Sequence, residues 1–173
     1  VYFQQNNSQL YKGLILAELG APVSIELDLE TGTGRVSRAK CRIKLPKRGW
    51  VTATTVRKAM GVDDAELEKR IIPLLQRNRI EYKPVKDNEA LAVLGRAWKP
   101  DGGGGVGAGA TALKELTDKR RYSMGTLGRS RVNEKLRLDE QSLQMTKEDL
   151  LAAVEYILKL PLGYGQLDHI DSL

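Results

Sequence analysis

Apolar and polar residues alternate in the stretch V-S-I-E-L-D-L at positions 23–29. A period of two is typical of a β-strand with one buried and one exposed face. The next residues, E-T-G-T-G, are typical of a turn, and R-V-S-R-A-K-C-R-I-K-L then alternates again. The pattern predicts a β-hairpin with one apolar and one basic face. The basic face would carry Arg38, Lys40, Arg42 and Lys44.

Beyond the hairpin, the apolar residues recur at the spacing of helices. The pattern predicts a short helix over residues 54–60, closed by Gly61. It predicts a second helix that is capped by Asp63 and interrupted at Pro73, and a third that starts at Asp87. These are separate short helices, without the repeating strand-helix-strand order of a parallel sheet.

The clearest helix follows Thr146, whose capping-box partner would be Asp149. Its apolar residues lie on one stripe, and Pro161 and Gly163 supply the expected ending. A hairpin combined with several short helices and one longer C-terminal helix predicts the α+β class.

The length of 173 residues favours one domain over residues 1–173. Within it, DGGGGVGAGA at positions 101–110 has few side chains with which to specify a structure, and it predicts a flexible connector, with a short helix over residues 110–116 beyond it. The opening VYFQQ is similar to the end of a protease-cleavage tag, which would place it outside the fold.

Positive charge is concentrated in two windows. Residues 35–58 hold nine basic residues and no acidic one, and residues 119–137 hold seven basic residues and one acidic one. The whole chain has a net charge of only +6, so the remainder is acidic. Two interpretations stay open for these windows: solvated surface, or a directed interface for an anionic partner, acting chiefly on phosphates. Aromatic residues are sparse, so stacking on bases is not expected to be the main mode.

The sequence gives little support for a nucleotide-binding loop, a metal site or a catalytic site. The glycine-rich stretch lacks the Gly-Lys-Ser/Thr ending of a phosphate-binding loop, and Asp168, His169 and Asp171 have no further cysteine or histidine to complete a metal site. The single Cys41 and the absence of an apolar run of roughly 18 residues or of a signal peptide predict a soluble, intracellular, non-membrane protein. No catalytic residue, metal or cofactor is predicted in this chain.

The second basic window resembles a sequence motif of a known protein family. RRYSMGTLGRSRVNEKLRL, residues 120–138, resembles the K-R-Y-D-L-x-x-V-G-R-x-K-x-N-x-K-L run of the β subunit of bacterial-type RNA polymerases. The matching residues are Arg121, Tyr122, Gly128, Arg129, Asn133, Lys135 and Leu136. MTKEDLLAAVEYILKL and GYGQLDHIDSL are similar to the two family motifs that follow, and EALAVLGRAWKPDG to one that precedes. The resemblance covers nearly the whole chain and is strongest over its last 85 residues. The lack of long insertions is more similar to cyanobacterial and plastid subunits.

The resemblance implies the lobe domain of the β subunit, which lines the downstream-DNA cleft and contacts non-template DNA. It implies DNA, the largest subunit, the α subunit, a sigma factor and lobe-docking transcription factors as partners. It implies a fragment of a nucleotidyltransferase whose magnesium belongs to the largest subunit. The location would be the bacterial cytoplasm, at the nucleoid, or the plastid stroma.

The same resemblance implies DNA contacts for Arg129, Arg131 and Lys135. It also implies that Ile170 and Asp171 help to form a pocket for an unpaired guanine, whose N1–H and N2–H₂ groups can donate hydrogen bonds to a carboxylate. The chain departs from the family at His169 and Ser172, which replace an aspartate and a histidine, and at Pro22, where the family has a base-stacking tryptophan.

Two other functional classes stay open, and the first of them would use the same basic windows. One is a stand-alone RNA- or DNA-binding module, such as a ribosome-associated protein, and the other is a protein-interaction domain without affinity for DNA. A reading frame that continues past residue 173 would favour the polymerase over both.

Overall fold

The computed structural model describes residues 1–7, 9–29, 39–44, 50–82, 86–98 and 105–168. Within these ranges, the strands form one antiparallel sheet in which each strand pairs with the next one along the chain. They are β1 (Tyr2–Asn7), β2 (Leu10–Ile15), β3 (Val23–Asp28), β4 (Lys40–Lys44) and β5 (Trp50–Thr52).

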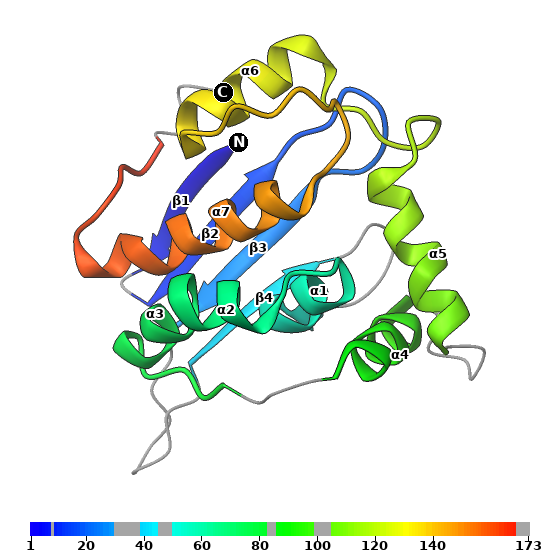
Figure 1. Cartoon of the computed structure of the whole chain (residues 1–173). Coiled ribbons are helices and arrows are strands. Elements are labelled where there is room, and N and C mark those ends of the chain that lie inside the picture. Colours follow the sequence, from blue (N-terminus) through cyan, green and yellow to red (C-terminus); the bar gives the residue numbers. More distant parts are fainter. Residues whose placement is uncertain (8, 30–38, 45–49, 83–85, 99–104, 169–173) are drawn as a thin grey trace.

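The helices lie over one face of this sheet or beside it (Figure 1). They are α1 (Ala53–Ala59), α2 (Asp64–Arg70), α3 (Ile72–Arg77), α4 (Asp87–Trp98), α5 (Val106–Thr117), α6 (Gly125–Leu136) and α7 (Lys147–Lys159), with a 3₁₀ turn, η1, at Leu160–Leu162. Helix α7 contacts β2 and β3, and α1 contacts β4 and β5. The architecture is therefore a sheet layer packed against a helical layer, and it confirms the predicted α+β class.

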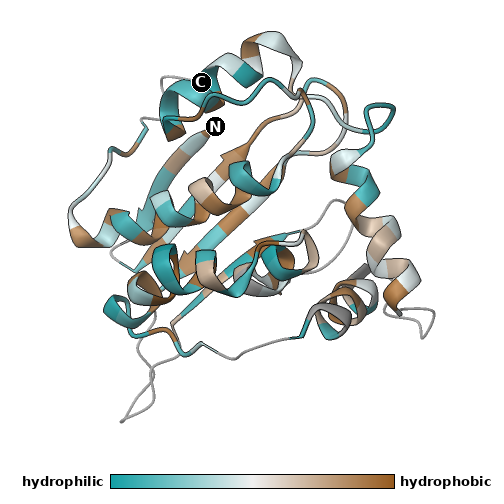
Figure 2. Cartoon of the chain, in the orientation of Figure 1, coloured by the Kyte–Doolittle hydropathy of each residue, from teal (hydrophilic) through white to brown (hydrophobic). Residues whose placement is uncertain are grey.

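The hydrophobic core lies between these two layers. Strands β3 and β4 contribute Ile25, Leu27 and Ile43 to it, all at most 1% exposed. Figure 2 shows brown residues along the strands beneath the helices, and teal residues on the outer sides of the helices. Removing this apolar surface from water is the main term that holds the layers together.

The predicted hairpin is confirmed for the strands that the structure describes. Strand β3 pairs antiparallel with β4, with Ile25 opposite Ile43 and Leu27 opposite Cys41. Cys41 is buried, and this burial raises the pKa of its thiol to about 12. The alternation therefore places the basic side chains of β4 on the opposite, outer face of the sheet.

The first residues of the chain belong to the fold, contrary to the interpretation of VYFQQ as a tag. Tyr2–Asn7 forms β1 at the edge of the sheet, and Phe3 is fully buried. Its ring stacks on Tyr156 of α7, with 4.4 Å between the ring centroids. The stretch lacks the regular apolar alternation that marks a strand, so the sequence pattern did not reveal it.

The helix boundaries follow the local signals. The Asp63 side chain accepts a hydrogen bond from the Glu66 N–H and caps α2, and Pro73 lies at the start of α3, where the chain has broken from α2. Thr146 and Asp149 form the predicted capping box of α7. These caps satisfy backbone groups that would otherwise lack partners at the helix ends.

The predicted glycine-rich connector is wrong for residues 106–110, which form the first turns of α5. Helix α5 packs closely on α4. A Cβ on Gly109 would lie 2.0 Å from the Leu91 carbonyl oxygen, and one on Gly95 would lie 2.1 Å from the Gly105 carbonyl oxygen. Glycine is needed here because only a residue without a side chain allows the two backbones to approach so closely.

Arg57 of α1 lies fully buried in the core. Its Nε donates to the Ala53 carbonyl oxygen, whereas neither terminal nitrogen has a hydrogen-bond partner within the described ranges. Burial lowers the pKa of this guanidinium to about 10. An unpaired buried charge costs stability, which the apolar contacts around it must offset.

The α4–α5 contact yields a matched pair of substitutions. Gly109→Ala should lower the free energy of unfolding by about 2–3 kcal/mol, because the new methyl group collides with a backbone carbonyl. Gly107→Ala should raise it by about 0.5–1 kcal/mol, since a Cβ at Gly107 meets nothing within 4 Å and alanine favours the helix. Urea unfolding of the two variants measures both effects. Equal effects would contradict the close packing.

Candidate nucleic-acid interface

From Gly125 on, the basic segment singled out in the sequence forms helix α6 and the turn that ends it. The helix starts at Gly125, whose φ of +72° suits glycine. It ends at Arg137, which adopts the left-handed conformation and donates its backbone N–H to the Asn133 carbonyl oxygen. Arg129 and Val132 lie on the buried side of the helix, whereas Arg131 is exposed.

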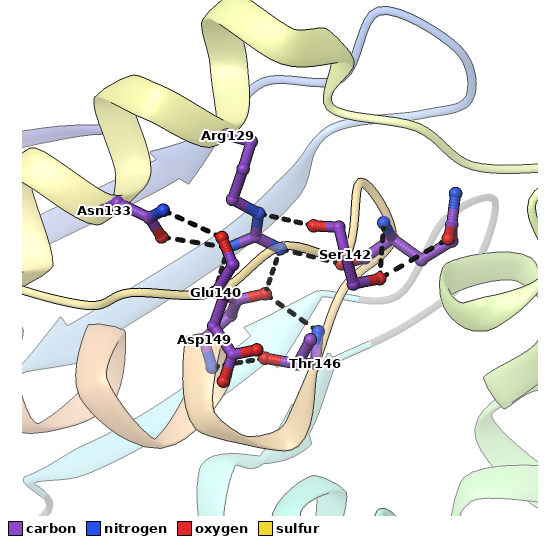
Figure 3. Close-up of polar contacts among 7 residues, drawn as sticks. Arg129, Asn133, Glu140, Ser142, Thr146 and Asp149 are labelled. Carbon is purple, nitrogen blue, oxygen red and sulfur yellow. Dashed lines mark hydrogen bonds and ion pairs between the residues drawn. The ribbon is translucent and has the colours of Figure 1, made fainter.

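Arg129 is the centre of a buried polar cluster (Figure 3). Its two terminal nitrogens donate to the two carboxylate oxygens of Asp149, at 2.6 and 2.8 Å. The same guanidinium also donates to the carbonyl oxygens of Ser142 and Gln144. Asp149 is fully buried, and its second role is to accept the Thr146 backbone N–H in the capping box of α7.

This position differs from the prediction that Arg129 contacts DNA. Its side chain is 6% exposed and its donors are used inside the protein. The hydrogen bond to Asp149 raises the pKa of the Arg129 guanidinium, so the arginine stays charged at neutral pH. Asn133 belongs to the same cluster, since its side-chain amide donates to the Glu140 carbonyl oxygen. These two motif residues join α6 to the segment before α7.

Lys135 attaches the C-terminal segment to the sheet. Its ammonium group lies 2.8 Å from the Asp168 carboxylate. Asp168 in turn accepts the Phe3 backbone N–H through its side chain and donates its own N–H to the Phe3 carbonyl oxygen, each at 2.8 Å. Lys135 therefore helps to hold Asp168, which precedes Ile170 and Asp171 in the chain, against the edge of β1.

A second contact fixes the same segment. The Tyr156 hydroxyl donates to the Gln166 carbonyl oxygen and accepts the Gln166 N–H, at 2.9 and 2.8 Å. Tyr156 itself contacts Phe3 and the Lys135 ammonium, which lies 5.5 Å from its ring centroid. The segment 163–168 is thus bound to α6, α7 and β1 together.

Two adjoining cavities lie between α6, α7 and this segment, with volumes of about 450 and 680 Å³. Both are lined by Lys135, Arg137, Tyr156 and Gly165. The larger one is also lined by Arg131, and the smaller one by Arg70, Lys159 and Tyr164. We call the two cavities together the basic cleft.

Most cations of the basic cleft are already paired. Arg70 binds Glu148 and Glu155, and Lys159 also binds Glu155. Arg131 and Arg137 are different, because neither side chain has a hydrogen bond or ion pair to any residue in the described ranges. These two guanidinium groups have no ion-pair partner among the described residues, and Glu134 is the acidic residue that lines the larger cavity with them.

The basic residues of the hairpin form a separate surface. Lys40, Arg42 and Lys44 lie on the outer face of β4, and none of them lines the basic cleft. Arg42 binds Glu26 on β3, with 2.6 Å between the charged atoms, and its guanidinium lies 4.5 Å from the Trp50 ring centroid. Among the described residues, the basic side chains of the hairpin therefore lie outside the basic cleft.

The positions of several residues at the site could not be predicted from the sequence. Arg137 lies in the second basic window, but only the chain reversal after α6 places it at the cleft. Tyr164 lies in the GYGQLD stretch, where the sequence has no signal that would separate a surface ring from a core ring. The predicted site residues Arg38, Ile170 and Asp171 lie outside the described residues.

Neither a membrane span nor a metal cluster is found in the part of the chain that the structure describes. Its helices are too short or too polar to cross a bilayer. Its His, Cys, Asp and Glu side chains do not gather in groups of three or more that suit a metal ion.

The fold and the cleft define the class: a two-layer α+β module with a basic cleft beside its edge strand. The chain matches the family described as RNA polymerase Rpb2, domain 2, over residues 23–173, and it belongs to that family. Relatives are named DNA-directed RNA polymerase subunit beta. One from Chaetosphaeridium globosum is 29% identical over 100% of this chain and 16% of its own length.

Two cyanobacterial relatives carry the same name. The one from Trichodesmium erythraeum (strain IMS101) is 31% identical over 76% of this chain and 12% of its own length. The one from Synechocystis sp. (strain ATCC 27184 / PCC 6803 / Kazusa) is 28% identical over 100% of this chain and 16% of its own length. The chain thus spans about one sixth of the length of most of these relatives. The predicted resemblance to the β subunit is confirmed.

The two arginines of α6 can be distinguished by mutation. Arg129→Met should lower the free energy of unfolding by about 3–5 kcal/mol, because it leaves the buried Asp149 carboxylate without its partner. Arg131→Met should change it by less than about 0.5 kcal/mol, since this side chain is exposed. Thermal or urea unfolding measures both. Equal stability of the two variants would contradict a structural role for Arg129.

Proposed function

We propose that this chain acts as the lobe of an RNA polymerase β subunit, on the wall of the downstream-DNA cleft, and contacts non-template DNA. The observation that carries the proposal is that Arg131 and Arg137 line the basic cleft without an ion pair to any described residue. Family membership supports the polymerase context.

Uncompensated arginines suit a phosphate backbone. A guanidinium can donate two parallel hydrogen bonds to a phosphate, and displacement of counterions from the strand adds to affinity. Lys135 is less suited to this role, because Asp168 already neutralises it. We therefore assign phosphate contacts to Arg131 and Arg137, and the positioning of the C-terminal segment to Lys135.

The outer face of the hairpin offers a weaker second surface for phosphates. Lys40 and Lys44 are exposed there, whereas Arg42 is shared between Glu26 and Trp50. Among the described residues, they do not line the basic cleft, so any phosphate that they bind would belong to another part of the nucleic acid.

In this proposal the chain binds and shapes the DNA path, and catalysis with its magnesium belongs to the largest subunit. The partners would be DNA, the largest subunit, the α subunit, a sigma factor and transcription factors that dock on the lobe. The location would be the bacterial cytoplasm or the plastid stroma.

The resemblance further supports a guanine pocket at Ile170 and Asp171. Their position in the chain closely follows Asp168, which Phe3 and Lys135 hold against β1. A carboxylate there would accept hydrogen bonds from the N1–H and N2–H₂ groups of an unpaired guanine.

The phosphate contacts are tested by the salt dependence of binding. The 173-residue chain should bind single-stranded DNA weakly, with an affinity that falls steeply between low and physiological salt. Substituting both arginines, Arg131→Ala with Arg137→Ala, should reduce the slope of log affinity against log salt by about 0.7 for each phosphate that is no longer neutralised. Fluorescence anisotropy of a labelled strand at several salt concentrations gives these slopes.

The control variant removes the same amount of positive charge at positions outside the basic cleft. Arg77→Ala with Arg96→Ala removes two exposed arginines, from α3 and α4. It should leave the slope within error of the unmodified chain. A salt-independent affinity, or an equal decrease in both double variants, would contradict the proposed contacts.

The guanine pocket is tested in the assembled polymerase. Asp171→Ala should weaken complexes with guanine at the pocket by about 1–3 kcal/mol and leave those with other bases unchanged, because only guanine offers the paired donors. Dissociation rates on templates that differ at this one base measure the effect. Asp139→Ala, at an exposed position, is the charge-matched control. An equal effect on all four bases would remove the assignment.

A further inference from the structure

Tyr164 is an exposed aromatic residue at the rim of the basic cleft. Its side chain is 56% exposed, whereas Phe3, Tyr11 and Tyr122 are buried in the core. It lines the cavity of about 450 Å³ together with Arg137 and Lys159. An exposed aromatic ring keeps its apolar surface available for contact with a ligand, and here that ring borders a cavity lined by basic side chains.

The backbone on both sides of Tyr164 is fixed. Gly163 and Gly165 have φ values of +91° and +76°, a conformation that glycine adopts without strain. The Tyr164 N–H donates to the Lys159 carbonyl oxygen at 3.2 Å. Two residues further on, the Tyr156 hydroxyl holds both backbone groups of Gln166. These hydrogen bonds therefore hold the backbone of Tyr164 in place at the edge of the cavity.

The two tyrosines of this cavity differ in the freedom of their rings. Tyr156 is stacked on Phe3 and contacts the Lys135 ammonium. Tyr164 has no ring contact or side-chain hydrogen bond to any residue within the described ranges. Among the described residues, the Tyr164 ring thus has no aromatic or cation-π partner, whereas the Tyr156 ring has both.

Charge next to the ring indicates what kind of ligand it would take. Lys135, Arg70 and Lys159 have carboxylate partners, and Arg137 has none among the described residues. The cavity thus combines one free guanidinium with one free aromatic ring. A nucleotide with an unpaired base carries the two complementary groups, a planar π-system and a phosphate.

We propose that Tyr164 stacks on one unpaired base of a single-stranded nucleic acid, whose phosphate is bound by Arg137. The proposal rests on the proposed function and adds a base contact to it. Because every base has a π-face, this contact tolerates any sequence. It is distinct from the guanine pocket, which depends on hydrogen bonds to Asp171.

The test compares a normal strand with one that lacks its bases. The 173-residue chain is titrated with labelled deoxythymidine oligonucleotides and with the same strands carrying abasic sites at every position. Tyr164→Ala should weaken binding of the normal strand by about 5- to 30-fold and leave binding of the abasic strand unchanged. Tyr164→Phe should retain the affinity, since the ring is kept.

The control is Leu19→Ala, which removes another side chain of similar exposure, 46%, away from the cleft. It should bind both strands as the unmodified chain does. If the unmodified chain binds the normal strand and Tyr164→Ala binds it equally well, the stacking proposal is overturned and the proposed function stands. If the unmodified chain binds neither strand at low salt, both are overturned. A decrease of equal size on both strands overturns the stacking alone.

Discussion

The ion pair between Arg129 and Asp149 is the interaction on which the site depends. Two charges buried together are tolerated only when their hydrogen bonds are satisfied, and here the guanidinium has carbonyl partners as well as the carboxylate. Asp149 also caps α7. One buried contact thus sets the position of α6 relative to α7, and the basic cleft lies between these two helices and the C-terminal segment.

Helix α6 divides its positive charges between two roles. Arg129 faces inward and braces the fold, whereas Arg131, and Arg137 at the end of the helix, remain without side-chain partners in the described structure. Lys135 combines the two roles, because it lines the cleft and its ammonium group also holds Asp168 beside β1. A segment can therefore be strongly basic and still pack, because the charge that enters the core is neutralised there and only the remainder faces the cleft.

Features that cost stability occur in parts of the fold away from the cleft. The α4–α5 pair approaches closely through glycine, at Gly95 and Gly109, at the expense of helix propensity. Arg57 is buried with two nitrogens unsatisfied among the described residues, so its charge weakens the core. Neither feature contributes to the cleft, and many of the residues that do contribute are joined by hydrogen bonds and ion pairs.

The α+β class, the β3–β4 hairpin, the caps of α2 and α7 and the family could all be predicted from the amino-acid sequence, because they depend on local periodicity and on motif residues close together in the chain. Other outcomes emerged only in three dimensions: Tyr2–Asn7 is a strand, Gly107 and Gly109 are helical, Arg129 points inward, and Arg137 and Tyr164 share a cavity. These outcomes depend on partners outside the local segment, such as Asp149 for Arg129 and Leu91 for Gly109, and no local pattern encodes such contacts.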